Sequence, residues 1–227
     1  MWGGGRRPEG TRRGAEAPPP DMGVQWPWMP RWFIGVLAAS ACAYAADLTV
    51  VLDFDGPHSD RSVEQMKRET EDIFKTTGLH LEWRTRADAV RGSYENLVVV
   101  HFKGKCILEP VPILYDERGP FAFTYNSDGA VLPFSDVECE HVTASVQSAM
   151  SGVDDHARPD YLMGRALGRV VAHELIHILT KSRAHAHDGV AQPALTARDL
   201  IGPPLRLTRE DVDKLREAGI QEAGGRR

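Results

Sequence analysis

The sequence has few cysteines, no stripe of basic residues and no apolar run as long as a membrane span. Its 227 residues include 27 lysines and arginines against 32 aspartates and glutamates, which gives a net charge of −5. The two signs are well mixed along the chain. A nucleic-acid-binding surface needs clustered positive charge, usually with interleaved aromatic side chains, so we expect no nucleic-acid partner.

The apolar run at residues 32–43 is shorter than the ~20 residues that a transmembrane helix requires. It follows Met29 and a positively charged residue, and it leads into an A-x-A pattern that ends at Ala45. This layout predicts a secretory signal peptide over residues 29–45, cleaved before Ala46. An uncleaved membrane anchor is the alternative interpretation.

Residues 1–28 are rich in glycine, proline and arginine, and such a segment cannot bury a core. We interpret it as disordered, or as a misassigned start upstream of the signal peptide. Residues 46–227, about 180 residues, are then enough for one domain. The expected location is secreted or periplasmic, with no stable membrane association after cleavage. A lipid anchor at Cys42 is a further alternative, although the residues before it lack the leucine expected of a lipidation site.

Removal of the signal peptide would leave two cysteines, Cys106 and Cys139. An even pair in an exported chain predicts a disulfide bond. The alternative is a pair of buried free thiols.

Hydrophobic periodicity and turn residues predict one α+β domain with a central mixed sheet. Pro133 indicates that the second arm of the predicted hairpin lies at a sheet edge. The last helix is expected to begin after Thr208, with Asp211 as its capping partner, and to end at Gly219. The expected elements are strands at 47–55, 79–84 and 96–104, a hairpin of 120–126 and 130–134, helices at 59–78, within 141–150 and at 161–180, an irregular segment at 184–207, and the last helix.

The long helix carries the sequence HELIH, in which His173 and His177 lie four residues apart. Side chains at this spacing share one helix face, so both imidazoles can reach one zinc ion. Glu174 follows the first histidine directly and points away from the ligand axis. It is therefore placed to accept a proton from a metal-activated water. An ordinary helix with two surface histidines is the alternative.

A third ligand should follow the helix. Arg183 lies six residues after His177, where the best-known long form of this motif has histidine, and arginine has no lone pair to give. His185, His187 and Asp188 all lie close behind, and spacing alone does not choose among them.

The stretch from His173 to Val190 resembles the active-site region of zincin metallopeptidases, metzincins in particular. The resemblance implies one catalytic Zn²⁺ held by His173, His177 and His185. It also implies that a tight turn beneath the metal follows His185. This sequence departs from metzincins at that turn, because Ala191 stands where they have methionine. The resemblance also implies a metzincin-like domain with an edge strand at the cleft, an active-site helix and a C-terminal helix.

These features predict an exported zinc-dependent endopeptidase that acts on peptides or proteins, with Glu174 as general base. An additional oxyanion donor could come from Tyr125 or Tyr161. One alternative is a catalytically inactive zinc-binding module, whose fourth position would be closed by His187 or Asp188. The other is a small exported α+β domain without metal.

Overall fold

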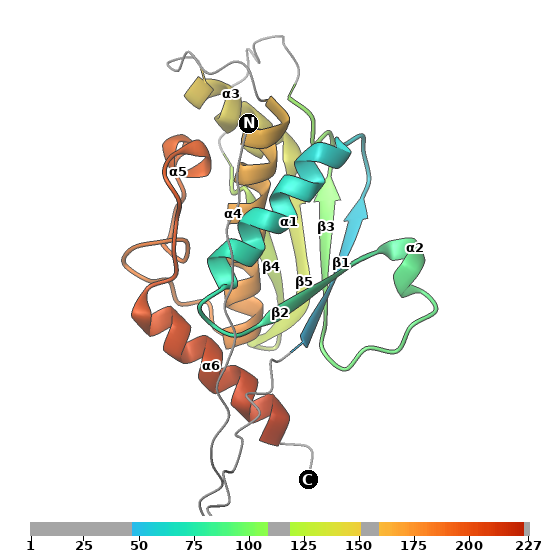
Figure 1. Cartoon of the computed structure of the whole chain (residues 1–227), viewed down its shortest axis with the longest axis vertical. Helices are drawn as coiled ribbons and strands as arrows, with labels where there is room; N and C mark the ends of the chain where they lie inside the picture. The colour runs from blue at the N-terminus through green and yellow to red at the C-terminus, as the bar shows by residue number, and fades with distance from the viewer. Residues whose placement is uncertain (1–46, 109–118, 151–158, 225–227) are drawn as a thin grey trace, which may run out of the picture. The chain divides into compact units, whose positions relative to one another are not determined.

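A five-stranded mixed sheet lies at the centre of the computed structural model (Figure 1). The structure describes residues 47–108, 119–150 and 159–224, with side chains as far as residue 218, and these residues belong to one unit, Ala43–Arg227. The predicted N-terminal extension, the signal peptide and Cys42 lie outside the described residues. The α+β class with a central mixed sheet is confirmed.

The strand order is β2-β1-β3-β5-β4, and only β4 runs antiparallel to its neighbour. The central strands are rich in β-branched residues, as strands buried in a parallel sheet usually are. The strands are β1 (Asp47–Phe54), β2 (His80–Thr85), β3 (Leu97–Lys103), β4 (Ala122–Ser127) and β5 (Ala130–Glu138).

The predicted helices at 59–78, 141–150 and 161–180 are present with small shifts of their ends. None of the helices in the described part of the chain has both the length and the apolar character needed to cross a bilayer. The helices are α1 (Asp60–Phe74), α2 (Arg86–Ala89), α3 (Cys139–Met150), α4 (Pro159–Thr180), α5 (Ala197–Ile201) and α6 (Arg209–Gly224).

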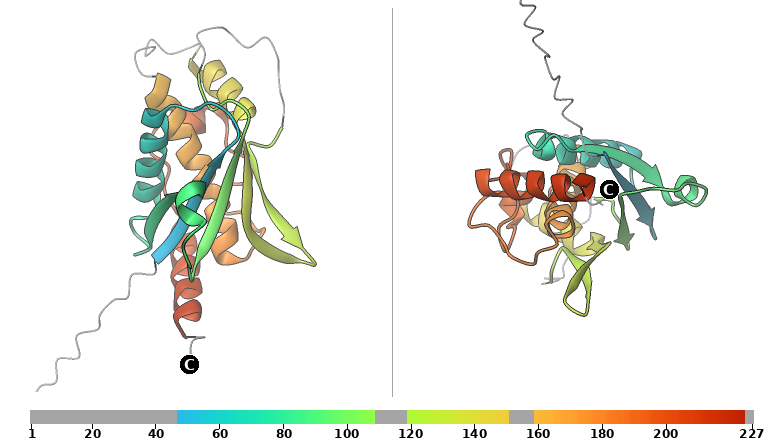
Figure 2. Two further views of the ribbon diagram at one scale, coloured as in Figure 1. Left: turned by 90° about the vertical axis from the view of Figure 1, so that its right-hand side faces the viewer. Right: turned by 90° about the horizontal axis from the view of Figure 1, so that it is seen from below.

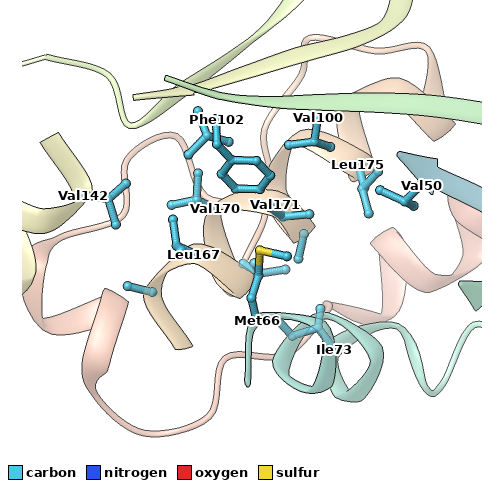
Figure 3. Packing of buried hydrophobic residues seen from close by; sticks show 14 of the residues in the cluster. Val50, Met66, Ile73, Val100, Phe102, Val142, Leu167, Val170, Val171 and Leu175 are labelled. Carbon is cyan, nitrogen blue, oxygen red and sulfur yellow. The ribbon is translucent and has the colours of Figure 1, made fainter. Parts of the chain in front are cut away.

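Helices α1 and α4 lie on the same side of the sheet (Figure 2, left), and the main core fills the space between them and the strands. Phe102 of β3 points toward α4, while Met66 of α1 approaches α4 from the other side (Figure 3). Both side chains are fully buried, and each such burial stabilises the fold by about 1.5–3 kcal/mol. The core therefore packs against α4, the helix that carries the HELIH sequence.

Glycine allows α4 to approach α1 closely. A Cβ atom at Gly164 would lie 2.4 Å from the carbonyl oxygen of Ser62, and one at Gly168 would lie 2.8 Å from that of Met66. Both distances are too short for carbon against oxygen, so larger residues at these positions would push the helices apart. The close crossing brings Thr70 of α1 within hydrogen-bonding distance of the Gly168 carbonyl.

A buried arginine on α4 joins three segments. The Arg169 side chain is 0 % exposed, and its Nε donates to Glu69 of α1 at 2.9 Å. Its terminal nitrogens donate to the carbonyl oxygens of Asp199, Gly202 and Pro203, at α5 and just beyond it. Burial lowers the pKa of Arg169, while the charge of Glu69 opposes that shift. The guanidinium thus fastens the α5 segment to the two central helices.

The prediction that the second hairpin arm forms an edge is wrong: β4 is the edge strand, and β5 lies between β3 and β4. Pro133 is accommodated because the pairing of β5 with β3 begins only at Phe134. Residues 184–207 are not wholly irregular either, since Thr196 and Asp199 form a capping box that starts α5.

The end of the last helix was also predicted wrongly. Helix α6 continues past Gly219 to Gly224. Its start is as expected, because Thr208 and Asp211 exchange hydrogen bonds at the first turn. Glycine lowers helix propensity by about 1 kcal/mol but does not by itself end a helix.

A polar network lies across β1, β3, β4 and β5 at the carboxyl ends of the parallel strands. His101 lies between Asp55, at 2.8 Å from Nε2, and Asp136, at 3.3 Å from Nδ1. Lys103 and Tyr125 each contact the other Asp136 oxygen at 2.6 Å. The hydrogen bond to Asp55 raises the pKa of His101, and Asp136 adds to this against the effect of burial.

The disulfide bond predicted from the cysteine count is present. Cys106 lies shortly after β3, Cys139 is the first residue of α3, and both are fully buried. The bond joins the end of a central strand to the residue that follows β5.

Candidate metal centre

Helix α4 places His173 and His177 one turn apart, and each ring is oriented by a backbone carbonyl. Nδ1 of His173 lies 2.8 Å from the carbonyl oxygen of Val190, and Nδ1 of His177 lies 2.8 Å from that of Ser182. A carbonyl oxygen can only accept a hydrogen bond, so both Nδ1 atoms carry the proton. Each neutral ring is left with a free lone pair on Nε2, the form in which histidine binds a metal.

The two Nε2 atoms lie 3.1 Å apart. With both protons on Nδ1, neither Nε2 donates to the other, and both lone pairs are available to one metal ion. Nitrogen ligands at 2.0–2.1 Å from a tetrahedral zinc ion lie about 3.3 Å from each other. The spacing of the two rings therefore fits a shared zinc ion.

His185 completes a group of three. One ligand atom from each of His173, His177 and His185 lies within 4.8 Å of the others. The chain reverses direction after α4, where Lys181 adopts a left-handed conformation with φ of 48° and the Ser182 amide donates to the His177 carbonyl. This reversal carries His185 back over the helix end.

The competing third ligands lie elsewhere. The side chain of His187 is 98 % exposed and contacts Asp188, whose own side chain is 82 % exposed. Neither belongs to the histidine group. The structure thus brings His185 close to His173 and His177. It does not bring His187 or Asp188 there, the two candidates for a fourth metal ligand.

The surroundings of His173 and His185 favour the neutral form of each ring. Burial lowers the pKa of His173 to about 4, with the neighbouring His177 and His185 adding to the effect. Burial and His177 also lower the pKa of His185. A lowered pKa keeps the ring neutral, and only the neutral ring can ligate.

A tight turn at Gly189 precedes Val190, whose carbonyl oxygen orients His173. Gly189 has φ of 79°, and a Cβ atom there would lie 2.4 Å from the Arg206 carbonyl oxygen. The next residue, Val190, is fully buried, and its amide donates to that same carbonyl. Ala191 is 4 % exposed, and its carbonyl accepts from Ala186. The turn is therefore held by backbone hydrogen bonds and packing, with alanine at the position where metzincins have methionine.

Glu174 is 4 % exposed and lies between α4 and the edge strand. The Thr124 hydroxyl on β4 donates to its Oε2 atom at 2.6 Å. Burial raises the pKa of Glu174, whereas hydrogen bonds from Thr124 and Ser135 and the charge of His177 oppose the rise. A carboxylate with a raised pKa accepts a proton more readily than an exposed one, which suits a general base.

Neither tyrosine considered as an oxyanion donor lies at this site. Tyr125 donates its hydroxyl to Asp136 in the polar network. Tyr161 lies in the first turn of α4, and the twelve residues to His173 span about 18 Å of helix. Sequence reasoning missed Thr124 and Ser135, and the only available signal was a pair of hydroxyl residues in the two hairpin arms.

The fold is similar to that of archaemetzincin from Methanopyrus kandleri. That solved structure aligns with a TM-score of 0.48 and 10 % identity, covering 78 % of this chain and 98 % of that chain. No protein-family model matches the chain, and no curated protein matches its sequence.

Proposed function

We propose that this chain is a zinc-dependent endopeptidase, as the zincin-like motif suggests. The observation that carries the proposal is the convergence of three histidine side chains beside a buried glutamate. His173, His177 and His185 would hold one Zn²⁺ and leave a position for solvent. Glu174 is the next residue after the first of these ligands.

A bound zinc ion would supply Lewis acidity, which makes a water more acidic and polarises a peptide carbonyl. The protein's own contribution is to move the proton. Glu174 would take it from the attacking water and deliver it to the leaving amine. The hydroxyl of Thr124 would keep the Glu174 carboxylate in place between the two transfers.

The edge strand offers a place for an extended peptide. β4 is the last strand of the described sheet and pairs with β5 alone among the described strands. Its outer edge can therefore accept a further strand through main-chain hydrogen bonds. Because Thr124 of this strand contacts Glu174, a peptide paired along β4 would lie next to the base.

The proposal includes export to the periplasm or the exterior, where the substrate would be a peptide or protein. The signal-peptide pattern at residues 29–45 and the disulfide bond support this location, since disulfides persist in oxidising compartments. N-terminal sequencing of the exported protein would test cleavage before Ala46.

The first experiment measures zinc per chain in the purified protein, its His185→Ala variant and a matched His187→Ala control. We expect about one zinc in the wild type and the control, and much weaker binding in the His185 variant. Equal loss in both variants would contradict the ligand assignment. Absence of zinc from the wild type would contradict the proposal as a whole.

The second experiment tests catalysis with Glu174→Gln. We expect hydrolysis of casein by the wild type and none by this variant, with zinc content unchanged. Equal hydrolysis by both proteins would exclude Glu174 as the base. Zinc binding without any hydrolysis would favour the inactive zinc-binding module.

A further inference from the structure

The general base proposed above is held by the strand along which the substrate would pair. Glu174 is almost fully buried, and a buried carboxylate needs hydrogen-bond donors. The Thr124 hydroxyl on β4 supplies one at 2.6 Å. Its direct partner in the β4–β5 register is Ser135, a second hydroxyl residue. The two hydroxyls therefore lie at paired positions on the two arms of one hairpin.

The two hydroxyls are not equivalent. Ser135 has a single hydroxyl proton, and it donates this proton to the carbonyl oxygen of Phe123 at 3.2 Å. The Thr124 bond measures 2.6 Å, a length typical of a hydroxyl donating to a carboxylate. Thr124 is therefore the principal donor to the base.

The backbone around Thr124 is also specialised. The β4–β5 register shifts between Thr124 and Asn126, where β5 has more residues than β4. The Asn126 side chain donates to the Thr124 carbonyl oxygen at 2.9 Å. Bulges change the direction of neighbouring side chains and are frequent beside active sites. Here the register shift and the Asn126 hydrogen bond both lie beside the residue that contacts Glu174.

We propose that Thr124 is a positioning residue for catalysis, one that orients the Glu174 carboxylate and links it to the peptide-binding edge of the sheet. This inference rests on the proposed peptidase function. Thr124 acts through Glu174, so its loss should slow turnover and leave metal binding and peptide binding intact. A hydrogen bond to a charged group contributes about 1.5–3 kcal/mol, which corresponds to a roughly ten- to hundredfold change in rate.

The test compares Thr124→Val, which keeps the shape and removes the hydroxyl, with Thr124→Ser, which keeps the hydroxyl. The matched control is Thr49→Val, because Thr49 is a buried strand threonine whose hydroxyl also contacts a glutamate, Glu82, at 3.4 Å. The measurement is kcat and KM of the zinc-loaded proteins on a quenched fluorescent peptide that the wild type cleaves. We expect kcat to fall at least tenfold in Thr124→Val only, with KM and zinc content unchanged.

A second measurement does not depend on activity. Unfolding midpoints in EDTA are recorded for Thr124→Val in the wild-type background and in a Glu174→Met background, where the acceptor is gone. We expect a clear loss of stability in the first background and little or none in the second. Equal shifts in both backgrounds would show that the two side chains do not interact, and would overturn the inference.

The outcomes separate the inference from the function beneath it. Equal kcat for Thr124→Val and Thr124→Ser in an active enzyme would overturn the positioning role and leave the peptidase proposal standing. A zinc-loaded wild type that cleaves no peptide would overturn the peptidase proposal itself, and the catalytic role of Thr124 with it. A selective fall in kcat together with non-additive unfolding shifts would establish the inference.

Discussion

Replacement of Arg169 by methionine should destabilise the fold more than any single change at the surface. The guanidinium is fully buried, and it donates to Glu69 and to three backbone carbonyl oxygens. Methionine fills a similar volume but donates no hydrogen bond. The substitution therefore leaves the carboxylate and the carbonyls without their shared donor.

The magnitude follows from the burial of the pair. Removal of one partner from a buried ion pair costs about 3–5 kcal/mol. Arg165 also contacts Glu69, at 3.5 Å, and would compensate for part of the loss. In a domain of this size, 1 kcal/mol shifts Tm by about 2–4 °C, so Tm should fall by roughly 6–20 °C.

The assay is thermal unfolding of the wild type, Arg169→Met and the control Arg165→Met, in the absence of metal. The control removes a more exposed arginine from the same helix and should cost about 1 kcal/mol. Similar Tm values for the wild type and Arg169→Met would refute the reasoning. They would show that the polar groups around Arg169 are equally well satisfied by water.

Three further predictions concern stability. Replacement of Cys106 and Cys139 by alanine should lower the free energy of unfolding by about 3–4 kcal/mol, the chain-entropy estimate for a sequence separation of 33. Denaturant titration would measure this loss. An unchanged midpoint would contradict the estimate. His101 has a raised pKa, so the folded state binds its proton more tightly than the unfolded state. Its stabilising contribution is complete below the ordinary value of 6.5 and is lost as pH rises through the higher folded value. The stability difference between the wild type and His101→Asn should accordingly shrink as pH rises above 6.5, and a constant difference would argue against the shift. Thr208→Ala should cost about 1 kcal/mol by removing the cap of α6, as seen by thermal unfolding against Thr208→Ser.

The elements with strong periodicity were predictable from the sequence. The motif helix was predictable because apolar residues recur at helical spacing along residues 161–180, and because His173 and His177 lie four residues apart. The strands of the sheet were predictable because runs of β-branched residues favour β-strands. Pro133 led to the wrong prediction of the edge strand. Proline indicates only a position whose backbone has no N–H to pair with a neighbouring strand. That position can also lie in an inner strand that extends beyond its neighbour, as β5 does.

The surroundings of Glu174 could not be predicted. Thr124 lies fifty residues away in sequence, and its contact with Glu174 depends on the packing of β4 against α4. The same holds for the carbonyl of Val190, which orients His173 from seventeen residues away. Such contacts follow from the tertiary fold, whereas the spacing of the two motif histidines follows from the helix itself.

The disulfide bond has a topological consequence for the edge strand. The segment between Cys106 and Cys139 contains both arms of the β4–β5 hairpin, so the hairpin belongs to a covalent ring. An exposed edge strand invites domain swapping, in which one copy of a chain gives its hairpin to another. A swapped element must open at one end, and here both ends are bonded to each other. The ring thus favours a hairpin that stays on its own sheet, and it does so without covering the outer edge of β4, where the proposed function places the peptide.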